Sequence, residues 1–202
     1  MKFAAALVPY VAVLLGMNVM GSAWSTILLY HAGILLFLVI GKRCSRWKTV
    51  FRGNTPLLIP SIVVCVMAAP VVYFMWPFFQ SPETELVEWM SMYGLTGMGW
   101  ALLIPYFSMV HPVLEEMHWR GIAPDPVRGL CWQDFMFAGY HVLVLYKLIY
   151  WPWLFLVFGI LVCSSFFWRW AVDRFGGYLL PVLTHAAADA GVMVGVILLL
   201  RG

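Results

Sequence analysis

The sequence of 202 residues contains few charged side chains: 12 Lys or Arg and 9 Asp or Glu make up 10% of the chain. An average soluble protein carries roughly a quarter. The sequence also has no internal repeat, no low-complexity tract and no polar stretch long enough to form a soluble domain. Because apolar residues make up 63%, these absences exclude an ordinary soluble or disordered protein and indicate an integral membrane protein.

Cysteine is scarce as well. Cys44, Cys65, Cys131 and Cys163 lack metal-ligand spacing, and two of them fall within apolar segments, so we expect free thiols. The net charge of +3 is small, and membrane topology explains it. We therefore expect no nucleic-acid partner.

Long apolar runs separated by short connectors dominate the chain. A hydrocarbon core of about 30 Å needs roughly 20 apolar residues per helix. The runs predict an all-α polytopic bundle of about seven transmembrane spans, in one domain covering residues 1–202. We place the spans at residues 3–22, 24–41, 56–76, 94–116, 134–149, 151–170 and 178–200. Weak turn signals between them leave six or eight spans as alternatives.

The basic residues predict an orientation. The segment MKFAAALVPY could be a signal peptide, but we expect it to remain as the first helix. Most basic residues fall on the side that holds the N-terminus: Lys2, Lys42, Arg43, Arg46, Lys48, Arg52, Arg120, Arg128, Arg169 and Arg174. The other side receives a loop with Glu83, Glu85 and Glu88. The positive-inside rule then places the N-terminus in the cytoplasm and the C-terminus outside.

Several ionisable residues lie inside the apolar segments, where such groups are costly and commonly face a bundle interior or a water-filled cavity. Three pairs have the spacing of one helical turn: His111 and Glu115, Glu116 and Arg120, His185 and Asp189. His141 has Phe137 four residues before it, and the isolated His31 is more typical of a structural or interfacial histidine.

Three helices bring such groups to a similar depth. Glu115 ends the fourth predicted span, whereas His141 and His185 each lie about 10 Å into spans entered from the cytoplasm. This arrangement suits a catalytic or metal site. The alternative is that each group only hydrogen-bonds across helices, which fits any one residue better than it fits the whole set.

Three short motifs follow one another in the second half of the chain: EEMHWR fits EExxxR, FAGYH fits FxxxH and HAAAD fits HxxxN/D. Together they resemble the CPBP intramembrane proteases, the family of CAAX prenyl endopeptidases and of bacteriocin-processing or self-immunity (Abi) proteins, over about residues 94–200. The resemblance implies an endopeptidase that cleaves a membrane-associated protein or peptide near the cytoplasmic side. The short chain and loops resemble prokaryotic members, which implies the prokaryotic cytoplasmic membrane.

The resemblance also implies residue roles. Glu115 and His141 would activate a water, and His185 and Asp189 would stabilise the oxyanion. Many family members have Asn in place of Asp189, and an ionised Asp would repel an oxyanion. Asp189 must therefore be protonated or must orient His185.

The remaining motif residues would have supporting roles. Glu116 and Arg120, one turn apart, would form an ion pair that anchors the helix end. Phe137 belongs to the FxxxH motif. His111 and His118 are expected to be structural.

We expect no cofactor, and zinc is the alternative because Glu115, His141 and His185 would also suit it. Glu115 and His118 form a Glu-x-x-His pair, but the HExxH pattern is absent. A carboxylate that acts as a base cannot comfortably also be a metal ligand, which favours the metal-free reaction.

A non-enzymatic protein for immunity or transport is a further alternative. A transporter commonly shows an inverted repeat with paired breaks in its helices, and the sequence shows none. We therefore expect the partners to be the lipid bilayer and a membrane-associated protein or peptide substrate.

Overall fold

The computed structural model describes residues 2–41, 48, 50–53, 55–122 and 127–202. These residues form helices and connectors with no strand; one isolated β-bridge joins Gln80 and Ile149. The predicted free thiol Cys44 and the basic residues Lys42, Arg43 and Arg46 lie outside the described residues. The other three cysteines are free, as predicted.

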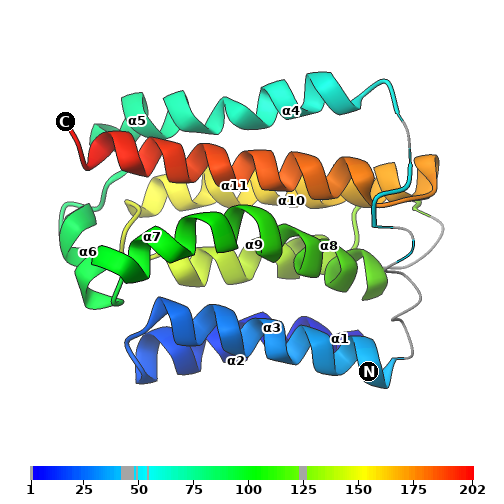
Figure 1. The fold of residues 1–202 in the computed structure, drawn as a ribbon, viewed down its shortest axis with the longest axis horizontal. Coiled ribbons are helices and arrows are strands. Elements are labelled where there is room, and N and C mark those ends of the chain that lie inside the picture. The colour runs from blue at the N-terminus through cyan, green and yellow to red at the C-terminus, as the bar shows by residue number, and fades with distance from the viewer. Residues whose placement is uncertain (1, 42–47, 49, 54, 123–126) are drawn as a thin grey trace.

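Most of the helices run side by side along one direction, and the short helix α6 (Leu86–Met92) lies across one end of them (Figure 1). In chain order they are α1 (Lys2–Ala6), α2 (Val8–Val13), η1 (Leu14–Val19), α3 (Ala23–Ile40), α4 (Leu58–Val66), α5 (Ala68–Phe79), α6 (Leu86–Met92), α7 (Gly97–Pro105), η3 (Tyr106–Val110), α8 (His111–Ile122), α9 (Trp132–Leu145), α10 (Trp151–Phe175) and α11 (Leu179–Leu199). The segments η1 and η3 are π-helical, a geometry that frequently occurs at functional sites.

Six helical segments of the described chain are long and apolar enough to cross a membrane: Lys2–Val19, Ala23–Ile40, Leu58–Phe79, Gly97–Ile122, Trp151–Phe175 and Leu179–Leu199. Each corresponds to a predicted span. The remaining predicted span is α9, which has 14 residues and falls short of the roughly 20 that a full crossing needs. The predicted all-α membrane bundle is confirmed, with α9 as its short member.

The two termini lie at opposite ends of the bundle (Figure 1). The connection between α10 and α11 lies at the end that holds the N-terminus, where the Leu179 N–H donates to the Arg52 carbonyl at 2.9 Å. Arg120 and Arg169 are only 6% and 3% exposed and pair with carboxylates. They are therefore interior groups, and the orientation signal rests on fewer exposed bases than the sequence indicated.

Helix α8 is the centre of the bundle and packs against α1, α3, α9, α10 and α11. The predicted span ended at residue 116, but the helix continues to Ile122, because the charge of Arg120 is paired inside the bundle. Eleven of its 12 residues are buried. Its two glutamates therefore lie within the protein interior rather than at the rim of a span.

Two glycines let α11 approach the α4–α5 layer. A Cβ at Gly191 would lie 3.2 Å from the Ala68 Cβ, and one at Gly195 would lie 2.8 Å from the Val72 Cβ. Small residues one turn apart commonly allow such close packing of membrane helices. This packing fixes α11, which carries the HAAAD motif, against the rest of the bundle.

Candidate active site

The side chain of Glu115 lies at the centre of the candidate site and is fully buried. Its Oε1 accepts hydrogen bonds from the Tyr30 hydroxyl at 2.6 Å, from the Trp119 indole N–H at 3.2 Å and from the Tyr140 hydroxyl. Its Oε2 has no hydrogen-bond partner among the described residues. The two oxygens of this carboxylate therefore have different surroundings, one saturated with donors and one open.

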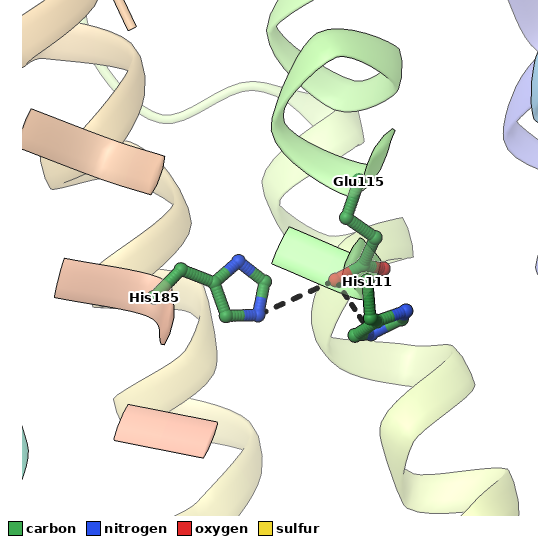
Figure 2. Close-up of side chains that lie close together, drawn as sticks. All are labelled: His111, Glu115 and His185. Carbon is green, nitrogen blue, oxygen red and sulfur yellow. Dashed lines mark ion pairs between the residues drawn. The ribbon is translucent and has the colours of Figure 1, made fainter. Parts of the chain in front are cut away.

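The open oxygen faces two imidazole rings (Figure 2). Oε2 of Glu115 lies 3.3 Å from Nε2 of His111 and 3.5 Å from Nε2 of His185. Oδ2 of Asp189 lies 3.7 Å from the same His185 nitrogen and also lacks a hydrogen-bond partner within the described chain. Oε2 of Glu115 thus faces two ring nitrogens, and the nitrogen of His185 also faces Oδ2 of Asp189.

The ring of His185 is held from its other nitrogen. Nδ1 lies 2.9 Å from Oε1 of Glu116, and the ring stacks on Trp168 with centroids 4.6 Å apart. A carboxylate can only accept, so Nδ1 carries a proton. Nε2 is thereby directed at Glu115 and Asp189, which is the direction needed for contact with a reacting group.

Glu116 also pairs with Arg120, whose guanidinium donates to its two oxygens at 2.8 and 3.3 Å. The predicted ion pair is therefore present, and it is buried. Arg120 also donates to the Ser165 hydroxyl at 2.8 Å, and that hydroxyl donates to Asp134 at 2.9 Å. Arg169 completes the network with a hydrogen bond of 2.7 Å to Asp134. Helices α8, α9 and α10 are joined by these buried contacts, which fix the position of the glutamate pair.

His141 contacts Glu115 only indirectly. Its Nδ1 lies 2.8 Å from the Phe137 carbonyl, and its Nε2 lies 3.1 Å from the Tyr140 hydroxyl, which donates to Glu115. A carbonyl accepts only, so Nδ1 carries a proton and Nε2 faces the tyrosine. The structure therefore brings Glu115, His185 and Asp189 into one group directly, and His141 joins it through a hydroxyl that the sequence analysis did not single out.

A chain of rings reaches the site from α3 and η3. His31 Nε2 lies 3.0 Å from Nδ1 of His111, and His31 Nδ1 lies 2.8 Å from the Tyr106 hydroxyl. His118 instead contacts the Ala5 carbonyl at 3.0 Å. The position of His111 one turn before Glu115 was visible in the sequence, but its link to His31 depends on packing of distant segments.

Among the described residues, one group has the geometry to hold a metal ion: ligand atoms of His111, Glu115 and His185 lie within 4.8 Å of one another. This group differs from the predicted zinc ligands, because His111 takes the place of His141. Zinc commonly binds imidazole nitrogen and carboxylate oxygen, and a metal-bound histidine commonly donates its other N–H to a carboxylate. The contact from His185 to Glu116 has that arrangement, so the donor set fits zinc.

Comparison with known proteins gives one match. Residues 97–191 match the model of a family described as type II CAAX prenyl endopeptidase, Rce1-like. All three motifs lie within the matched residues, so the predicted family resemblance is confirmed. No curated protein and no solved structure matches the chain.

Proposed function

We propose, from the membership of residues 97–191 in the Rce1-like family of CAAX-type membrane proteases, that this integral membrane protein hydrolyses peptide bonds with Glu115 as the general base. The observation that carries the proposal is the open Oε2 of Glu115, a buried carboxylate oxygen that no donor of the described chain occupies. A base must have a free lone pair within hydrogen-bond reach of the proton it removes.

The proposed reaction has two steps. Glu115 takes one proton from a water while the water oxygen forms a bond to the carbonyl carbon of the substrate, which gives a tetrahedral oxyanion. Glu115 then returns that proton to the amide nitrogen as the C–N bond breaks, which releases an amine and a carboxylic acid. The same carboxyl group thus acts first as base and then as acid.

His185 and Asp189 are the proposed stabilisers of the oxyanion. Because Glu116 binds Nδ1 of His185, donation from Nε2 requires the doubly protonated ring. Asp189 donates only as the neutral acid. Preorganised donors in a site that excludes water commonly contribute 10²–10³-fold in rate, so this pair would supply about that much.

His141 is proposed to act on Glu115 through the Tyr140 hydroxyl, which lies between them. The predicted arrangement, in which Glu115 and His141 share a water directly, would require that hydroxyl to move. A fixed contact through the hydroxyl keeps Oε1 of Glu115 in place and leaves Oε2 to carry out the proton transfer.

The substrate is proposed to be a membrane-associated protein or peptide, cleaved near the cytoplasmic side of a prokaryotic membrane. Glu115 lies seven residues from the end of α8, and His185 lies six residues after the start of α11, about 10 Å from the bundle end that holds the N-terminus. A segment anchored in the membrane could reach this depth from the lipid.

The test uses the full chain in liposomes with quenched fluorescent peptides that end in Cys-aliphatic-aliphatic-X, with and without a farnesyl group. Glu115→Gln should abolish cleavage without loss of folded protein. Glu83→Gln, on an exposed connector residue at the far end of the bundle, is the matched control and should keep wild-type activity. Cleavage by the Glu115→Gln protein, or none by the wild type, would contradict the proposal and favour a non-enzymatic role.

A zinc-dependent version of the same protease is the second candidate, and the compact group of His111, Glu115 and His185 favours it. In that case the metal would lower the pKa of a bound water and polarise the carbonyl. Glu115 would then be a ligand, and the base would have to be another group.

A further inference from the structure

We infer that His111 is a further catalytic residue, which holds the attacking water together with Oε2 of Glu115 and Nε2 of His185. This inference rests on the proposed function. None of the three family motifs contains His111, which precedes the glutamate pair by one turn on α8.

The two oxygens of the Glu115 carboxylate differ in their hydrogen bonds. Oε1 already accepts from Tyr30, Trp119 and Tyr140, and a carboxylate oxygen has two lone pairs. A water has no free lone pair to bind on that side. The base must therefore work through Oε2, which faces His111 and His185 (Figure 2).

The gap between Oε2 of Glu115 and the two ring nitrogens is large enough for one water. The distances from Oε2 to the two ring nitrogens are 3.3 and 3.5 Å, and ligand atoms of the three residues lie within 4.8 Å of one another. For a triangle of that size, one water oxygen can lie about 2.8 Å from every corner, the usual length of an O–H···O hydrogen bond. Such a water would give Oε2 of Glu115 the partner that it otherwise lacks, and a buried polar atom without a partner is costly.

Contacts with His31 and Tyr106 orient the His111 ring. Its Nδ1 lies 3.0 Å from His31, and His31 lies 2.8 Å from the Tyr106 hydroxyl. We assign to Nδ1 of His111 the proton that points to His31, and to Nδ1 of His31 the proton that points to the tyrosine oxygen, since this arrangement leaves Nε2 of His111 able to accept from a water. The Nε2 of His111 then presents a lone pair to the site. His31 and Tyr106 are thus positioning residues that act through His111.

These contacts define the attack. The water donates one hydrogen to Oε2 of Glu115 and the other to Nε2 of His111, and one of its lone pairs accepts from Nε2 of the doubly protonated His185, so its second lone pair is left for the substrate carbonyl. The proton that is transferred goes to Glu115 and later to the leaving amine, while His111 orients the water and exchanges no proton overall. The other titratable groups that lie near this point, or that bind the rings and the carboxylate forming it, are Tyr30 and His31 of α3, Tyr106 of η3, Glu116 of α8, Tyr140 and His141 of α9, and His185 and Asp189 of α11.

The first test needs no substrate. A crystal structure of the wild-type protein, grown from a lipid mesophase and with data collected at the zinc edge, should show one oxygen about 2.8 Å from all three atoms, with no anomalous signal. His111→Phe should lose that density while its ring stays on Phe107, which stacks on His111 at 4.6 Å. A metal about 2.1 Å from the three ligands, or a site without density, would overturn the inference.

The second test separates positioning from structure. His111→Phe should lower kcat about 100-fold with KM nearly unchanged. His111→Gln, whose amide oxygen can accept from the water, should have a kcat between those of His111→Phe and the wild type. His31→Phe should lower kcat about tenfold, and the double variant should be no slower than His111→Phe, because His31 acts through His111. His118→Gln, on the same helix, is the control for loss of a buried histidine. Additive losses of kcat in the double variant would contradict the inference that His31 acts through His111.

The two proposals fail in different ways. If Glu115→Gln is inactive but His111→Phe keeps its kcat, the inference about His111 is wrong and the proposed function stands. If the ordered water is present but the wild-type protein cleaves no peptide of the panel, the water site stands and the protease assignment is wrong.

Discussion

Glu116 binds His185 across the helix interface, with 2.9 Å between its Oε1 and the ring Nδ1. The same carboxylate pairs with Arg120 on its own helix. The second glutamate of the EExxxR motif is therefore more than an anchor for a helix end. It determines which nitrogen of His185 is protonated, and so connects the first motif with the third.

This relationship predicts different consequences for the two glutamates. Glu116→Ala and Arg120→Ala each leave a buried charge without its partner, which typically costs about 3–5 kcal/mol. Both variants should therefore lose folded yield as well as activity. Glu115→Gln should keep its yield, because its amide oxygen can still accept from Tyr30 and Trp119.

Size-exclusion chromatography and thermal unfolding of the purified variants provide the measurement. Glu116→Gln is the conservative control, since the amide retains part of the contact with Arg120. An equal loss of folded protein in Glu115→Gln, Glu116→Ala and Arg120→Ala would mean that the pair of glutamates has only a structural role.

A second prediction concerns the hydroxyl between Glu115 and His141. Tyr140→Phe keeps the ring, which stacks parallel to Trp119, but removes the connection between the carboxylate and the imidazole. We expect kcat to fall by about 10-fold to 100-fold with KM nearly unchanged, as for loss of an interaction made in the transition state.

The control for Tyr140 is Tyr10→Phe. The Tyr10 hydroxyl also donates to α9, at the Met136 carbonyl and a distance of 2.8 Å, but this contact does not involve Glu115. Loss of one such hydrogen bond should cost about 1 kcal/mol of stability and leave kcat near the wild-type value. Equal kinetic losses in the two variants would show that Tyr140 acts only through the packing of α9.

Membrane orientation gives a third prediction. In a background without native cysteines, Glu83→Cys and Arg174→Cys place single thiols at exposed positions at opposite ends of the bundle. By the positive-inside rule, a membrane-impermeant maleimide added to whole spheroplasts should label the first and not the second. Permeabilised spheroplasts are the control, in which both should react. Labelling of Arg174→Cys in intact spheroplasts would reverse the proposed orientation.

The sequence predicted the bundle well because each span is a local apolar run. The exception is α9, which has 14 residues and packs closely against α10. The predicted spans also placed most basic residues at one end of the bundle. They gave no sign that Arg120 and Arg169 are buried, because that depends on ion pairs with Glu116 and Asp134.

The site was predictable where spacing within one helix determines contact and where similar depth in the membrane brings motif residues together, as for Glu115 and His185. The motif residues Glu116 and Arg120 lie one turn apart and meet as expected. The partners of Glu115 from α3 and α9 could not be foreseen, because Tyr30 lies 85 residues away along the chain and Tyr140 lies 25 residues away. A tyrosine in an apolar segment is also ordinary, so it gives no signal of its own.

The last prediction concerns Asp189, whose Oδ2 lies 3.7 Å from His185 and has no hydrogen-bond partner in the described chain. If Asp189 donates to the oxyanion, Asp189→Asn should keep activity within about threefold and extend it to higher pH, because an amide donates at every pH and a carboxyl only when protonated. The measurement is kcat/KM against pH for the wild-type and variant proteins.

The opposite result would mean that Asp189 orients His185 or ligates a metal. If Asp189 orients His185 or ligates zinc, Asp189→Asn should be at least about tenfold slower, since an amide is a poorer ligand and a poorer acceptor for an imidazole N–H. Metal analysis and chelator treatment distinguish these two roles. A stoichiometric metal whose removal silences the enzyme, together with an inactive Asn variant, would make His111, Glu115 and His185 its ligands. Activity that survives chelation in both proteins would support Glu115 as the base.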